Sequence, residues 1–133
     1  MAKSKTSDSS IIVRWKNTPD KHDYPAAASY LSLIADPDEV DKLVARLKKA
    51  PIRTHKAKDI LRAAQLEALP LDNPHVREDL QKVAAGIVLS PVLIVRGNLL
   101  KGYPTQIADG YHRVCASYHL DENTDIPSRI IDL

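Results

Sequence analysis

Residues 107–113 read Ile-Ala-Asp-Gly-Tyr-His-Arg, and this stretch decides the fold that the sequence predicts. A short apolar segment ends at Ala108, and apolar residues at positions 114, 115 and 118 follow at helical spacing, which indicates a strand, a tight turn and a helix. Gly110 supplies the backbone freedom that such a turn needs. Asp109 is predicted to cap the helix with its side chain.

The first turn of that helix is predicted to bind an anion. Backbone N–H groups in a first turn lack partners within the helix, and the helix dipole is positive at this end. His112 and Arg113 add two side-chain donors at the same place. We expect Arg113→Ala to weaken phosphate binding and to leave the fold intact. The alternative is that Asp109 only caps the helix, His112 packs, and Arg113 pairs with a surface carboxylate.

This segment resembles the signature of the ParB/sulfiredoxin-like superfamily. The ordered elements from Val76 to Ile131 match the same superfamily, and the N-terminal half resembles a single-domain bacterial subgroup labelled ParB-like nucleases. In that superfamily the signature turn binds the phosphates of a nucleotide or of another phosphorylated ligand. The resemblance therefore implies a nucleotide such as ATP, ADP or CTP, with Mg²⁺ as a companion ion. The residues implied in binding are Asp109, Gly110, Tyr111, His112 and Arg113.

Further candidates for the same site lie outside the signature. Glu78 and Asp79 fall on the helix predicted beside it, and an acidic residue there could act as the general base of a phosphotransferase; the alternative is an exposed helix face. Lys82 on the same helix is another candidate. Lys56 and Lys58 belong to a strongly basic segment, for which anion binding and a solvated face both remain open.

Some activities of the superfamily do not fit the chain. Sulfiredoxins need a catalytic cysteine inside the signature, and Tyr111 at the matching position cannot replace a thiolate. ParB clamps need a helix-turn-helix, and no recognisable one follows the signature. Nucleases need clustered carboxylates for metal ions, whereas the signature region offers only Asp109. No metal site is predicted, because the histidines outside the signature show no ligand spacing.

Three functions remain. The first is a protein that binds a nucleotide or phosphorylated ligand, with a small phosphotransferase as its enzymatic form. The second is an accessory protein that associates with DNA or RNA through basic side chains. The third is a protein-interaction module with a degenerate site. Whether the chain is an enzyme, and its oligomeric state, stay open at this point.

Composition sets the broader limits. The chain has 133 residues, 27% of them charged and 44% hydrophobic, with a formal charge of +2, which fits one globular domain without demanding a nucleic-acid partner. No apolar run is long enough to span a bilayer, and the polar N-terminus lacks the apolar core of a signal peptide, so we expect a cytoplasmic protein without a membrane partner. The single cysteine, Cys115, is predicted to be buried and unreactive.

The predicted fold class is α/β (α+β), with a small mixed sheet and packed helices. We expect a disordered tail over 1–10 and a single domain over 11–133, in which 11–75 is a helical extension and 76–133 the phosphate-binding core. The continuous apolar run Val92–Val95 predicts a strand covered on both faces. Further strands are expected near residues 11–15, 106–108 and 126–131. Helix starts are expected at Pro25, Asp36, Thr54 and Asn73.

Overall fold

Four strands form one mixed sheet in the order β2-β5-β3-β4. The computed structural model describes residues 11–133, so the prediction for residues 1–10 lies outside the described part. The strands are β2 (Ile52–Lys56), β3 (Val92–Val95), β4 (Gln106–Asp109) and β5 (Asp125–Ile131). β5 lies parallel to β3, whereas β2 and β4 pair antiparallel with their neighbours. The predicted class, a small mixed sheet with packed helices, is confirmed.

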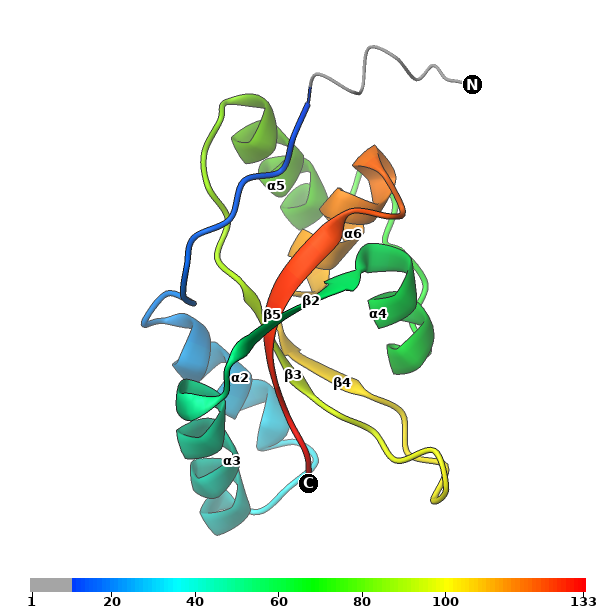
Figure 1. Ribbon diagram of the computed structural model, residues 1–133. Helices are drawn as coiled ribbons and strands as arrows, with labels where there is room; N and C mark the ends of the chain where they lie inside the picture. Colours follow the sequence, from blue (N-terminus) through cyan, green and yellow to red (C-terminus); the bar gives the residue numbers. More distant parts are fainter. Residues whose placement is uncertain (1–10) are drawn as a thin grey trace.

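Helices cover both faces of this sheet (Figure 1). They are α2 (Asp23–Leu31), α3 (Pro37–Lys49), α4 (Ala57–Ala64), α5 (Pro74–Ala84) and α6 (Tyr111–Leu120). α2 and α3 pack on one face through a core that includes Leu93 and Val95. α4, α5 and α6 pack on the other face, against Val92 and Ile94. The apolar run of β3 therefore supplies two cores, as predicted, because successive strand residues point to opposite faces.

Local capping signals located two of the helices correctly. The Asp36 carboxylate accepts a hydrogen bond from the Glu39 N–H at 2.9 Å, and α3 follows with Pro37 in its first turn. The Asn73 side chain accepts hydrogen bonds from two backbone N–H groups at the start of α5. Such caps satisfy N–H groups that a helix leaves unpaired, so their effect can be read from adjacent residues.

Three predictions of element position differ from the structure. The helix predicted to start at Thr54 exists as α4 but begins at Ala57, because residues 52–56 form strand β2 and pair with β5 over five positions. Residues 11–15 form no strand; only Trp15 makes an isolated bridge, to Leu89. α2 begins at Asp23, two residues before the predicted start at Pro25. β2 also brings a strand of the N-terminal half into the same sheet as residues 92–131.

No helix within residues 11–133 is long and apolar enough to cross a membrane.

Candidate functional site

A β-bulge and a glycine shape the turn from β4 into α6. Leu93 pairs with Asp109 and Ile94 pairs with Ile107, so Ala108 is the extra residue of the bulge. Paired residues face the same side of a sheet, and the bulge therefore turns Asp109 toward the side that α2 covers. Gly110 then adopts a φ of +110°, and a Cβ at this position would lie 2.4 Å from a methyl carbon of Val92. Only glycine fits there.

The predicted capping role of Asp109 was wrong. Gly110 is the N-cap of α6, and no side chain caps this helix. The Asp109 carboxylate instead accepts a hydrogen bond from Nη2 of Arg113 at 2.7 Å. Burial raises the pKa of Asp109, although Arg113 opposes this effect. The N–H groups of the first turn of α6 are thus left without a side-chain acceptor among the described residues, as an anion site requires.

Arg113 lies between two carboxylates. Its guanidinium contacts Asp109, and its Nη1 lies 3.6 Å from the Asp23 carboxylate and donates to the Ser90 hydroxyl. Asp23 is 2% exposed and also accepts a hydrogen bond from Ser90. Because removal of one partner leaves buried charge uncompensated, we now expect Arg113→Ala to destabilise the fold, contrary to the expectation from the sequence.

A cleft of about 390 Å³ opens beside this turn. Its walls are the segment before α2, the outward side of α5, the connector before β3, and the β4–α6 turn. The sequence-predicted residues that line it are Glu78, Asp79, Lys82, Asp109, Gly110, His112 and Arg113. Residues that the sequence did not indicate also line it: Lys16, Asp20, His22, Asp23, His75 and Ser90. No sequence signal identifies these residues as part of the site, because the fold alone brings them close to the signature.

Tyr111 does not line the cleft. Its hydroxyl donates to the Glu67 carbonyl at 2.5 Å, and its ring packs against the core on the α4 side. Cys115 is fully buried in the same region, where the Leu69 N–H donates to its sulfur at 3.3 Å. Burial raises the pKa of the Cys115 thiol, which disfavours the reactive thiolate. The predicted burial of Cys115 is confirmed, and Tyr111 has a structural position.

Lys56 and Lys58 are also outside the cleft. Lys56 ends β2 and lies 3.8 Å from the Asp125 carboxylate. The backbone N–H of Lys58 donates to the Glu122 carbonyl, in the loop that follows α6. Both residues therefore belong to the opposite end of α6 from the signature turn.

α5 contributes two acids with different environments. Glu78 is exposed, whereas Asp79 is only 8% exposed, so the alternative of an exposed helix face was wrong for Asp79. Burial raises the pKa of Asp79, and its nearest cation is Lys82, with Nζ 4.0 Å away. Asp79 makes no hydrogen bond through its carboxylate within residues 11–133. Asp79 is therefore a buried carboxylate beside a cleft, and its oxygens can still accept hydrogen bonds.

Two histidines meet across α5 and α6. The ring centroids of His75 and His112 are 4.8 Å apart. Burial lowers the pKa of His112, and the neighbouring His75 lowers it further. His112 is therefore a neutral donor near pH 7, which can give one hydrogen bond but brings no charge.

The cleft as a whole is not basic. Five carboxylates and three cationic side chains line it, so its formal charge is −2 when its histidines are neutral. Asp20, His22 and Asp23 could share one metal ion, because one ligand atom of each lies within 4.8 Å of the others. The sequence reasoning missed this spacing of His22. The carboxylates are already engaged, Asp20 with Lys16 at 2.7 Å and Asp23 with Arg113, so a metal would have to compete with these contacts.

Comparison of the chain with protein-family models, with curated proteins and with solved structures found no match. The resemblance to the ParB/sulfiredoxin-like superfamily therefore stays a prediction.

Proposed function

We propose that the cleft at the β4–α6 turn binds a phosphorylated ligand, with a nucleotide as the preferred class. The observation that carries the proposal is the start of α6, where Gly110 leaves the first-turn N–H groups uncapped and His112 lines the adjoining cleft. Oriented backbone N–H groups bind phosphate oxygens without needing a net positive site. Asp109 and Arg113 hold the turn in shape in this proposal, and Lys82 and His112 contact the ligand.

A divalent cation is part of the proposal. The cleft carries a formal charge of −2, so a bare polyphosphate would be repelled by its carboxylates. A bound Mg²⁺ prefers oxygen ligands and usually bridges one or two carboxylates and the substrate phosphates. Asp20 and Asp23 offer such carboxylates at the edge of the cleft, where the metal would compete for them with Lys16 and Arg113. The metal would offset the negative charge of the carboxylates and that of the ligand phosphates.

Phosphoryl transfer is the enzymatic form of this proposal. Such a reaction depends on positioning and charge neutralisation, and on a residue that accepts the proton of the attacking hydroxyl. Asp79 suits that last role, because it lines the cleft and burial raises its pKa. A nucleotide-dependent phosphotransferase would act in the cytoplasm, where its nucleotide is available.

Calorimetry with ATP, ADP and CTP, each with and without Mg²⁺, tests the binding proposal. We expect binding that requires Mg²⁺, and a loss of about ten- to hundredfold for Lys82→Ala, because one charge-assisted hydrogen bond contributes about 1.5–3 kcal/mol. Lys101→Ala is the matched control, since this exposed lysine lies outside the cleft. No binding of any nucleotide, or an equal loss in both variants, would remove the support for the cleft.

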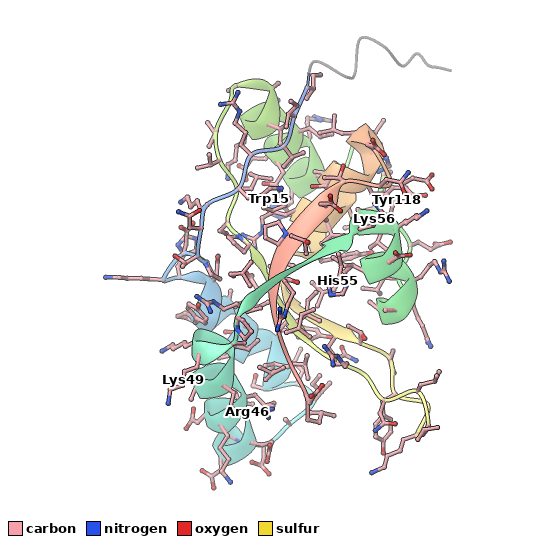
Figure 2. All side chains as sticks on the ribbon, in the orientation of Figure 1. Trp15, Arg46, Lys49, His55, Lys56 and Tyr118 are labelled. Carbon is pink, nitrogen blue, oxygen red and sulfur yellow. The ribbon has the colours of Figure 1, made fainter. Side chains whose placement is uncertain are left out.

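A second candidate function rests on a separate surface. Residues 42–62 contain eight of the 19 basic residues of the chain and one acid. We call them the basic band; it runs along the second half of α3, β2 and α4. Figure 2 labels Arg46 and Lys49 on α3 and His55 and Lys56 on β2 within it. Such a surface suits a nucleic-acid backbone.

Salt dependence separates the two candidates. Nucleic-acid binding through the basic band would weaken steeply with salt, with a slope that counts the phosphates contacted. Fluorescence anisotropy with labelled duplex DNA and single-stranded RNA over a salt series measures this slope. A flat response, or no binding at low salt, would rule out the nucleic-acid function.

A further inference from the structure

The connection between β3 and β4 presents two leucines to solvent. Leu99 and Leu100 are each 96% exposed, more than any other large apolar residue among those described. The hairpin that carries them is well formed, since Asn98 and Tyr103 exchange two backbone hydrogen bonds of 2.9 and 3.0 Å. The Lys101 N–H also donates to the Asn98 side chain. The leucines thus form an ordered apolar tip.

A mainly apolar cavity lies at the base of the same hairpin. It holds about 250 Å³ and is lined by Ile60, Ala63, Ile94 and Ile130, with polar groups around them. Arg96 and Thr105, which flank the hairpin, complete its wall. This cavity is partly open to solvent, and its volume leaves room for a branched aliphatic side chain to enter from outside.

The tip of a chain cannot fill the cavity of the same chain. Arg96 and Thr105 belong to the root of the hairpin, and Figure 1 shows the tip extending away from the helices and the rest of the sheet. The apolar tip and the apolar cavity are complementary, and one molecule carries both. A second copy of the chain can therefore place its leucine tip in the cavity of the first.

We propose that two copies associate by inserting the Leu99–Leu100 tip of each into the cavity of the other. A reciprocal exchange closes into a twofold dimer, in which each contact occurs twice. One tip–cavity contact is small beside the roughly 1,200 Å² of a stable interface, and the exchange doubles it. We expect a dissociation constant on the order of micromolar. The inference is independent of the ligand in the cleft.

The wall of the cavity carries charges of both signs, Asp59 and Arg96, and the carboxylate suits a lysine on the incoming tip. Lys101 follows the two leucines and is exposed. Asp59 lines the rim of the cavity, and its side chain is 52% exposed, with Arg62 at 3.7 Å as its only ion-pair partner among the described residues. A tip that enters the cavity of a second copy would bring its lysine toward this carboxylate. Such an exposed ion pair raises the rate of association more than it raises the affinity.

Sedimentation velocity over a concentration range from about 1 μM to about 1 mM tests the exchange. The wild-type chain should pass from monomer to dimer. Leu100→Asp should raise the dissociation constant about a hundredfold or more, because it places a charge where an apolar side chain is buried. Ala63→Glu, at an exposed position of α4 in the cavity wall, should do the same.

Two controls make the result specific. Leu33→Asp changes another leucine, 80% exposed, that lies outside the hairpin and does not line the cavity, and should leave the dimer unaffected. Circular dichroism at a concentration low enough to keep every chain monomeric should give the same melting temperature for all the variants, since each changes an exposed residue. An equal mixture of Leu100→Asp and Ala63→Glu chains should regain a weakened dimer, because one tip and one cavity remain intact in the mixed pair.

Three outcomes would overturn the proposal. A wild-type chain that stays monomeric at all concentrations excludes the exchange. Dimerisation of Ala63→Glu with wild-type affinity would mean that the tip contacts something other than the cavity. Co-sedimentation of the monomeric chain with anionic phospholipid vesicles, lost in Leu100→Asp, would assign the tip to a lipid surface instead.

Discussion

Arg113 and the arginines of the basic band differ in their surroundings more than in their chemistry. Arg113 has a side chain only 14% exposed, and it lies against carboxylates from α2 and β4. Arg46 and Arg53 are exposed and lie within 4.0 Å of no carboxylate in the described part of the chain. The buried arginine is therefore committed to the fold, whereas the exposed ones remain available to a partner.

This difference changes how an anion site should be recognised. A motif with two basic residues appears positive in the sequence, yet the folded cleft around it is formally negative. Besides Lys82, the donors left free there are backbone N–H groups and a neutral imidazole, which recognise phosphate by geometry. The basic band keeps its charge but has no such geometry. Four predictions test the contrast, from the largest expected effect to the smallest.

The largest effect should come from Arg113→Ala. It leaves Asp23 and Asp109 without their shared cation, and breaking a buried pair in this way costs about 3–5 kcal/mol. Urea unfolding monitored by circular dichroism measures the loss. Asp23→Asn added to Arg113→Ala should recover part of it, since one uncompensated charge is removed. Arg53→Ala, in the basic band, is the control and should shift stability by less than about 0.5 kcal/mol. An equal loss of stability in Arg113→Ala and Arg53→Ala would contradict the difference between the buried and the exposed arginine.

Gly110→Ala should have the next largest effect. The left-handed backbone costs about 1–2 kcal/mol for a residue with a Cβ, and the contact with Val92 adds about 1–3 kcal/mol of overpacking. Gly86→Ala is the matched control, because its φ is +76° but no atom lies within 4 Å of the added carbon. Thermal unfolding of both variants measures the difference. If Gly86→Ala is as costly as Gly110→Ala, the close approach to Val92 is not a constraint.

Asp79→Asn should stabilise the protein by about 1 kcal/mol at neutral pH, because it removes a negative charge that burial disfavours. Burial raises the pKa of Asp79 above its ordinary value of 3.8, so the folded chain binds this proton more tightly than the unfolded chain does. Ionisation therefore reduces stability as the pH rises from 3.8 through the raised pKa. The stability gained by Asp79→Asn should vanish below pH 3.8, where the carboxyl is protonated in both the folded and the unfolded chain. Unfolding midpoints across a pH series measure it, and a gain independent of pH would contradict the assignment.

The smallest effect on stability should be that of Lys49→Ala, an exposed change in the basic band. Stability should stay within about 0.5 kcal/mol of wild type. If the band binds duplex DNA, the slope of log affinity against log salt should fall by about 0.9 for the lost phosphate contact. Lys21→Ala, outside the band, should leave the slope unchanged. A slope that is the same for Lys49→Ala and wild type would exclude Lys49 from any such contact.

Predictions from adjacent residues succeeded where local physics decides the outcome. Asp36 and Asn73 cap helices because their acceptors lie two or three residues from the N–H groups they satisfy. The apolar run of β3 was assigned to two cores because alternation of side chains along a strand is a local property. Cys115 was placed in the core by its helical spacing. These features need no knowledge of distant segments.

The helix start predicted at Thr54 was wrong for the opposite reason. Residues 52–56 include basic residues and a capping side chain, which permit a helix, but they pair over five positions with β5, 69 to 77 residues later, and the helix begins only at Ala57. The capping role predicted for Asp109 was wrong for a similar reason, since the bulge opposite β3 turns its carboxylate toward α2. In both cases a long-range pairing outweighed a weak local preference.

Adjacent residues were enough to predict the strand–turn–helix unit around Gly110, the start of α3 and α5, and the two-sided apolar strand, because these depend on neighbours within a few residues. The tertiary structure was needed to show that Asp23 neutralises Arg113, that Asp20 and His22 line the cleft beside Glu78 and Asp79, and that Tyr111 and Lys56 do not. Electrostatics and burial depend on which segments meet in space, and the meeting of α2, α5 and the β4–α6 turn is set by the packing of helices on the sheet.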